Sequence, residues 1–180
     1  MATTQKVPIV FVDTGSGALS DATLAGTAVK TGRWQMPAYV TKSVFGIVKI
    51  PESLAGSPNP KIEVVVGSGA PLGGASVDVA TKVFDEEGAV YDLSLLVRGE
   101  IQDFSVPVGA KRTKKLTFTD GDLSSVIAGK LLWVEVRRLG GCGRVANEAD
   151  IELIGADLSI DLTSTGVSAA KLFARAAMGI

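Results

Sequence analysis

The sequence predicts an all-β protein: a jelly-roll-type antiparallel sandwich with an extended N-terminal arm and a short C-terminal helix. Three observations lead to this prediction. Between residues 43 and 162, short segments alternate apolar with polar residues, as strands with one buried face require. About eight such segments follow one another with irregular links between them. No helical period appears before residue 162, so no crossover helices join the strands.

Residues 1–33 are rich in Thr, Gly, Ala and Ser and show no sustained hydrophobic period. A segment of this composition is stable mainly when it lies against another surface. We therefore interpret residues 1–33 as an extended arm. One apolar run in it provides candidate interaction residues: Pro8, Ile9, Val10, Phe11 and Val12.

The sandwich is predicted over residues 34–163. Pro51 closes the second strand, and the prolines at positions 58 and 60 mark a turn because proline fixes φ and removes a backbone donor. The predicted strands are, in order, residues 34–40, 43–50, 62–66, 75–84, 90–97, 101–106, 115–119, 131–138 and 151–162.

The last predicted strand changes phase along its length. Its inward residues are odd-numbered at Ile151 and Leu153, but even-numbered at Leu158 and Ile160. One extra residue in a strand produces this shift, so we predict a β-bulge near Gly155.

Residues 164–180 form the predicted C-terminal tail. Within it, residues 167–178 place apolar side chains on one face of a short amphipathic helix. Such a helix is marginal alone and is expected to dock on its own sandwich or on a neighbour. Leu172 and Phe173 are the candidate interaction residues there.

Composition bounds the function. Of the 180 residues, 46% are hydrophobic and 21% charged, and the mean hydropathy is +0.32, so some apolar surface is expected at subunit contacts. The formal charge of −1 provides no general attraction for nucleic acid or an anionic membrane. The apolar run near the start is too short for a signal-peptide core, so we expect synthesis in the cytoplasm of a host cell.

Catalytic residue sets are nearly absent from the sequence. There is no histidine, which excludes Ser-His-Asp and Cys-His catalysis and imidazole metal sites. Cys142 is the single cysteine, so no intrachain disulfide and no multi-cysteine zinc site can form. We expect no catalytic residue, no cofactor site, no metal site and no small-molecule substrate.

One motif supports an enzymatic alternative. Residues 9–16, with Asp13-Thr14-Gly15 inside them, resemble the active-site element of aspartic proteases, and residues 153–157, ending at Asp157, weakly resemble the second element of that family. Retroviral-type proteases place the two elements much closer together, and a two-lobed protease needs a second Asp-Thr-Gly. We therefore favour an ordinary turn at Asp13.

Two charged clusters have structural interpretations. The basic run at residues 111–115 contains no aromatic residue, so it is interpreted as a solvated strand edge and not as a nucleic-acid surface. Asp120-Gly121-Asp122 lacks the remaining ligands of a calcium loop and is interpreted as a hairpin turn.

Four segments together resemble small jelly-roll proteins of tailed-phage virions. They are Trp34-x-Met36-Pro37, the strand that ends at Ile50-Pro51, residues 129–140 around Trp133, and residues 148–153. The resemblance covers about residues 34–162. In that group, comparable modules form trimers as capsid decoration (cement) proteins or as parts of head and tail fibres.

The resemblance implies a non-enzymatic virion protein located on the capsid surface. Its expected partners are copies of itself, as a homotrimer, and the major capsid protein. Trp34 and Trp133 are candidate anchors at these contacts, with the alternative that each lies in the core of its own chain. A receptor-binding module of a fibre, using the loops at residues 67–74 and 140–147, is the second interpretation.

Overall fold

The computed structural model describes residues 3–13, 18–23, 30–51, 60–69, 72–84, 95–106, 108, 113–119, 123, 129–140 and 149–162. In these ranges the regular elements are twelve strands. They are β1 (Thr3–Pro8), β2 (Val10–Asp13), β3 (Ala18–Thr23), β4 (Lys30–Met36), β5 (Lys42–Lys49), β6 (Pro60–Gly67), β7 (Leu72–Phe84), β8 (Val97–Arg98), β9 (Gln102–Val106), β10 (Thr113–Phe118), β11 (Leu131–Leu139) and β12 (Ile151–Leu162).

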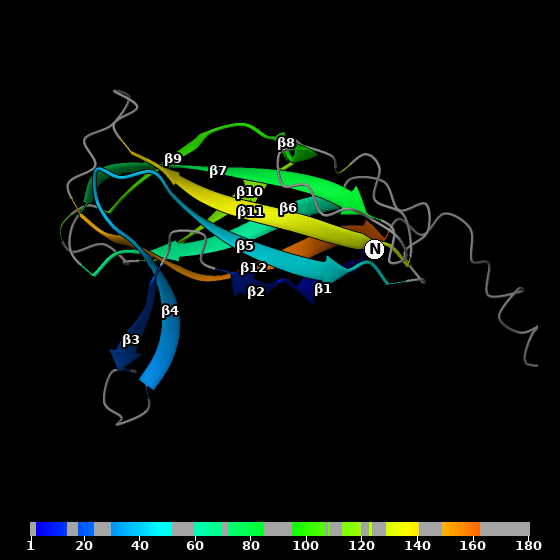
Figure 1. Ribbon diagram of the computed structural model, residues 1–180, viewed down its shortest axis with the longest axis horizontal. Helices are drawn as coiled ribbons and strands as arrows, with labels where there is room; N and C mark the ends of the chain where they lie inside the picture. The colour runs from blue at the N-terminus through cyan, green and yellow to red at the C-terminus, as the bar shows by residue number, and fades with distance from the viewer. Residues whose placement is uncertain are drawn as a thin grey trace, which may run out of the picture.

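The strands form two antiparallel sheets that lie face to face (Figure 1). Sheet A has the order β10-β6-β12-β4-β3, and β1 also pairs with β12. Sheet B has the order β2-β5-β11-β7-β8, and β9 also pairs with β7. When β4 to β7 and β9 to β12 are counted as one to eight, the two sheets have the orders 1-8-3-6 and 2-7-4-5. This is the jelly-roll topology of two Greek keys, so the predicted fold class is confirmed.

The hydrophobic core lies between the two sheets and follows the alternation seen in the sequence. The long strands β5, β6 and β11 contribute alternate residues, as does β12 on each side of its bulge, and the buried side chains are mainly valine, isoleucine and leucine. Val64 and Val66 face the core from β6, and Val134 and Val136 face it from β11. Outward positions on the same strands carry charges, such as Glu63 and Arg137.

The prediction that residues 1–33 form an extended arm is wrong for residues 3–13. β1 pairs along β12 from Thr3↔Leu162 to Pro8↔Asp157, whereas β2 pairs with β5 in the other sheet. The chain changes sheet at Ile9, whose side chain is 6% exposed and belongs to the core. Residues 3–13 are therefore strands of the sandwich. Their alternation is hard to recognise because each strand is short and the change of sheet reverses its phase.

Gly46 explains how this crossing fits. A Cβ at that position would lie 2.6 Å from Cγ2 of Ile9 and 3.0 Å from Cδ1 of Phe11. The missing side chain on β5 therefore makes room for Ile9, between β1 and β2, and for Phe11 on β2.

β3 and β4 form a hairpin that extends away from the sandwich (Figure 1). Only residues 34–36 of β4 pair with β12, whereas β3 pairs with β4 along its whole length, from Ala18↔Gln35 to Thr23↔Lys30. Residues 18–23 and 30–33, which the sequence assigned to an irregular arm, are thus a two-stranded ribbon attached to sheet A.

Several boundaries differ from the sequence prediction. The strand predicted over residues 34–40 is β4, which ends at Met36 because Pro37 has no N–H to donate and Tyr39 has a φ of 61°. The bulge predicted near Gly155 is confirmed, since the register of β12 against β6 shifts between Leu153 and Gly155. The predicted helix in the tail lies outside the described residues, as do the turn at residues 120–122 and Cys142.

Candidate interaction surface

The Tyr39 turn, residues 37–41, connects β4 to β5 and carries the chain from sheet A to sheet B. Tyr39 has a φ of 61°, in the left-handed region. A side chain with a Cβ is strained there by about 1–2 kcal/mol. Such a conformation persists only where surrounding contacts hold it.

Three hydrogen bonds hold the turn. The backbone N–H of Ala38 donates to Oδ1 of Asp150 at 2.8 Å, and the N–H of Gly140 donates to Oγ1 of Thr41 at 3.0 Å. Just before the turn, Nη1 of Arg138 donates to the carbonyl oxygen of Met36 at 2.7 Å. The strained turn is therefore fixed from β11 and from the start of β12.

Gly140 allows the closest of these contacts. A Cβ on Gly140 would lie 2.5 Å from the carbonyl carbon of Val40, 2.6 Å from the nitrogen of Thr41 and 2.7 Å from the carbonyl oxygen of Tyr39. All three atoms belong to the backbone. The end of β11 and the turn can pack this closely only because residue 140 has no side chain.

The turn presents two apolar side chains to solvent. Tyr39 is 66% exposed and Val40 is 46% exposed. Both belong to the hydrogen-bonded turn at one end of the sandwich, which follows β4 of the β3–β4 hairpin (Figure 1). The sequence prediction missed this feature because it extended a strand to Val40, although Pro37 was the signal for a turn.

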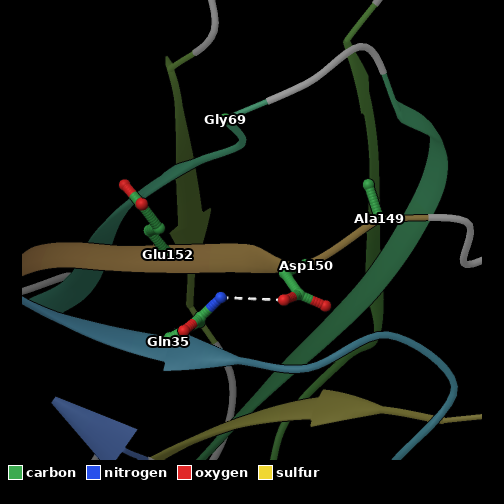
Figure 2. Close-up of a pocket in the computed structure, with 5 residues that line it drawn as sticks. All are labelled: Gln35, Gly69, Ala149, Asp150 and Glu152. Carbon is green, nitrogen blue, oxygen red and sulfur yellow. Dashed lines mark hydrogen bonds between the residues drawn. The ribbon is translucent and has the colours of Figure 1, made fainter. Parts of the chain in front are cut away.

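A hollow lies next to the turn (Figure 2). Its volume is about 260 Å³, and its lining includes Gln35, Gly69, Ala149, Asp150 and Glu152. The amide of Gln35 points to Asp150 and donates to Oδ2 at 2.8 Å. No group of three or more residues able to hold a metal ion occurs among the described residues.

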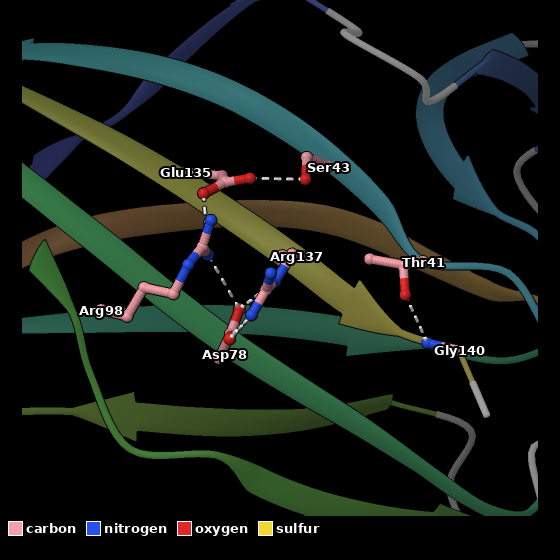
Figure 3. Close-up of polar contacts among 7 residues, drawn as sticks. All are labelled: Thr41, Ser43, Asp78, Arg98, Glu135, Arg137 and Gly140. Carbon is pink, nitrogen blue, oxygen red and sulfur yellow. Dashed lines mark hydrogen bonds and ion pairs between the residues drawn. The ribbon is translucent and has the colours of Figure 1, made fainter. Parts of the chain in front are cut away.

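The outer face of sheet B carries an ionic cluster of Asp78, Arg98, Glu135 and Arg137 (Figure 3). The two carboxylates are 3% and 6% exposed although they face outward, because the two guanidinium groups cover them. Arg137 donates to Asp78 through Nε at 3.0 Å and through Nη2. These hydrogen bonds to the carboxylate raise the pKa of the Arg137 guanidinium. Arg98 Nη1 lies 2.9 Å from Oε2 of Glu135, whose other oxygen accepts from Ser43 at 2.5 Å.

We predict that Asp78→Asn lowers the free energy of unfolding by about 2 kcal/mol, because it leaves Arg137 without its carboxylate and removes one of the two carboxylates beside Arg98. Chemical denaturation measures this loss. A double-mutant cycle with Arg137→Met should show a coupling energy of about 1 kcal/mol or more. Additive effects of the two substitutions would contradict the predicted coupling.

The outer face of sheet A carries a second ionic group. Glu63 on β6 accepts from Lys115 on β10 at 2.8 Å and from Lys6 on β1. The glutamate is 11% exposed at its side chain, whereas the two lysines are about half exposed. Hydrogen bonds from Lys115 and Lys6 hold the pKa of Glu63 below its ordinary value. Glu63 therefore joins β1, a strand from the predicted arm, to β6 and β10 of the same sheet.

This group predicts a dependence of stability on pH. Because the pKa of Glu63 is lower in the folded state than in the unfolded chain, its stabilisation is present above the unfolded value of about 4.3. It is lost as the pH falls through the folded pKa. Glu63→Gln should be less stable than the wild type by about 1 kcal/mol at pH 7. Thermal unfolding from pH 7 to pH 3 should show this difference shrinking; a constant difference would contradict the assignment.

The structure separates the predicted interaction residues. Ile9 is buried in the core, and Val10 is 61% exposed on the edge strand β2. Phe11 and Trp34 are partly buried and pack against the core, so Trp34 contributes to the core of its own chain. Pro8 ends β1 and is exposed, Val12 lies in β2, and Leu172 and Phe173 lie outside the described residues.

Trp133 lies on the outward side of β11, where its ring meets Phe84 edge to face at 6.5 Å between centroids. It is half-buried there. Its role as an anchor for a partner stays a prediction.

The two aspartates of the protease alternative lie on different sheets. Asp13 ends β2 in sheet B, and its side chain lies outside the described residues. Asp157 lies on β12 in sheet A, opposite Glu63 and Pro8. Lys114 and Lys115 of the basic cluster lie on β10, which is an edge strand of sheet A. This position agrees with the interpretation of the cluster as a strand edge.

These features define an all-β jelly-roll sandwich with a projecting hairpin and a fixed, exposed turn. No protein-family model and no curated protein matches the sequence. Among the described residues, no helix has the length and hydropathy needed to cross a membrane.

Three solved structures illustrate what the fold is similar to. The K1 adhesin domain of Lys-gingipain from Porphyromonas gingivalis is 13% identical, with a TM-score of 0.43 over 87% of this chain and 97% of the domain. The family 11 carbohydrate-binding module from Clostridium thermocellum is 9% identical, with a TM-score of 0.40 over 84% and 95%. Tailspike protein 4 of bacteriophage CBA120 is 8% identical, with a TM-score of 0.37 over 89% of this chain and 19% of the tailspike chain. Similarity at this level transfers no site and no function to this chain.

Proposed function

We propose that this protein is a non-enzymatic structural protein of a tailed-phage virion: a capsid decoration protein that forms homotrimers and binds the lattice of the major capsid protein. The observation that carries the proposal is the β3–β4 hairpin, which projects from a closed jelly roll (Figure 1). A projecting element on a rigid sandwich suits attachment to other subunits.

The hairpin supports assembly for a physical reason. A two-stranded ribbon is marginally stable in water by itself. β3 pairs only with β4 among the described strands, and residues 30–33 of β4 pair only with β3. Contact with a neighbouring subunit would stabilise the ribbon and use the backbone groups at its two outer edges.

The charge distribution supports a protein partner. The outer faces of both sheets carry acids and bases paired with each other, as in the Asp78 and Glu63 groups, and the formal charge of the chain is −1. Such faces provide no strong field for nucleic acid or membrane. Recognition would then depend on shape and on exposed apolar side chains. The proposed location is the outer surface of the capsid.

The first experiment is to measure the mass of the purified protein in solution and its co-sedimentation with purified empty phage shells, with purified tails as the control. A trimer that binds shells at a saturating, lattice-like stoichiometry is the expected result. Absence of binding to every shell tested would contradict the proposed role.

A receptor-binding module of a head or tail fibre is the second candidate. The hollow at Gly69 and Asp150 favours it, because Gly69 belongs to one of the loops that the sequence analysis assigned to recognition (Figure 2). Binding to tails and not to shells would select this candidate. Cleavage of a peptide library by the wild type, abolished in Asp13→Asn, would instead select the protease alternative.

A further inference from the structure

We propose that the buried guanidinium of Arg138 binds a small monatomic anion, chloride in ordinary buffers, through its Nε–H and Nη2–H groups. Three features of the molecule support this site: the burial of Arg138, its two unused hydrogen-bond donors and the charges around it. Neither shells nor tails are involved, so the site is independent of the proposed function.

Arg138 is a buried charge with an incomplete set of contacts. It is 0% exposed on the inward side of β11, and burial lowers the pKa of its guanidinium. Nη1 donates to the carbonyl oxygen of Met36 at 2.7 Å, whereas Nε and Nη2 are buried without an acceptor among the described residues. A buried charged donor is costly unless it is hydrogen-bonded, and the partner can be an ordered water or an ion. These two N–H groups therefore mark a place for a bound acceptor.

The two open donors lie on the edge of the guanidinium that binds anions. Nε–H and Nη2–H point in the same direction and can donate together to one anionic group. Arg137, the neighbouring residue, uses the same two nitrogens to hold the carboxylate of Asp78 on the outer face of sheet B. Arg138 presents this pair of donors to the interior, where an occupant has to be small. A single halide ion can accept from both N–H groups.

The surrounding charges favour an anion over a water molecule. Lys42 on β5 lies opposite Arg138 in the register, and opposite residues of antiparallel strands share one face of the sheet. Asp150 is the carboxylate whose charge acts on Arg138, but it is exposed and accepts from Ala38 and Gln35 (Figure 2). Water would accept the hydrogen bonds and leave the buried charge uncompensated, whereas an anion does both.

Crystals of the wild type grown in sodium bromide test the site directly. Bromide substitutes for chloride, and its anomalous scattering distinguishes it from water. The expected result is an anomalous peak in contact with both Nε and Nη2 of Arg138. A water molecule at these nitrogens would overturn the proposal, and so would an acceptor supplied by the chain itself.

Thermal unfolding tests whether the anion binds in solution. Each protein is unfolded in sodium chloride and in sodium gluconate at equal ionic strength, so that screening is the same and only chloride is small enough for the site. A ligand that binds only the folded state raises the unfolding temperature. The change from gluconate to chloride should therefore favour the wild type over Arg138→Met by roughly 2–4 °C. Equal responses of the two proteins would mean that a bromide peak in the crystal is an adventitious ion only.

The neighbouring arginine provides the matched control. Arg137→Met removes an outward guanidinium from the same strand and should respond to chloride as the wild type does. If Arg137→Met loses the response as fully as Arg138→Met, chloride acts elsewhere and the site at Arg138 is wrong. The bromide crystals need only the wild type, so they decide the question even if Arg138→Met does not fold.

Discussion

Gly140→Ala is expected to lower the free energy of unfolding by about 3 kcal/mol. The added Cβ would lie 2.5–2.7 Å from three backbone atoms of residues 39–41. A side chain could rotate away from such a contact, but the backbone of the turn can relieve it only by moving as a unit. That movement would lengthen the hydrogen bond from Gly140 to Thr41 and disturb the one from Ala38 to Asp150.

Chemical denaturation of the variant measures this loss, and a decrease of roughly 6–12 °C in the unfolding temperature should accompany it. The matched controls are Gly69→Ala and Gly155→Ala, because a Cβ at either position meets nothing within 4 Å. Both should remain within about 0.5 kcal/mol of the wild type. Equal losses at all three positions would contradict the assignment to the turn, because the effect of Gly→Ala on the unfolded chain is stabilising at every position.

The sandwich was predictable because its strands have one buried and one solvated face. This alternation is clearest in β6 and β12, whose inward residues are apolar and whose outward residues are mostly polar. The bulge in β12 was predictable for the same reason, since an extra residue reverses the phase of the pattern at Gly155.

The N-terminal strands were not predictable from the same pattern. β1 and β2 have six and four residues, and between them the chain moves from one sheet to the other at Ile9. Their burial depends on long-range partners, since β1 lies against β12 and Ile9 fills the space left by Gly46. Neither partner is near in sequence, so local composition suggested an arm.

The candidate surface could not be predicted from the sequence for a similar reason. Arg138 lies 102 residues from its partner Met36, and Asp150 lies 112 residues from its partner Ala38. Gly140 can lie against the turn only because it has no side chain. The ionic cluster joins Asp78 to Arg137 across neighbouring strands. The register of the strands brings these groups together, and the pairing partners of a strand cannot be read from its local pattern alone.

Arg138→Ala is expected to lower the free energy of unfolding by about 3 kcal/mol, because it removes the largest fully buried side chain among the described residues. Arg138 is 0% exposed at the inward side of β11, and its burial lowers the pKa of the guanidinium, against the opposing charge of Asp150. Its Nη1 donates to Met36, whereas Nε and Nη2 have no hydrogen-bond acceptor. Alanine would leave a cavity and an unsatisfied carbonyl at the start of the turn.

Arg138→Met separates the volume of this side chain from its charge. Methionine fills much of the same space and removes a buried charge that is incompletely hydrogen-bonded, so the two effects should nearly cancel the lost bond to Met36. We expect this variant to unfold within about 1 kcal/mol of the wild type by chemical denaturation. If Arg138→Met instead loses as much stability as Arg138→Ala, the hydrogen bond to Met36 and the charge beside Asp150 stabilise this end of the sandwich, and packing volume does not.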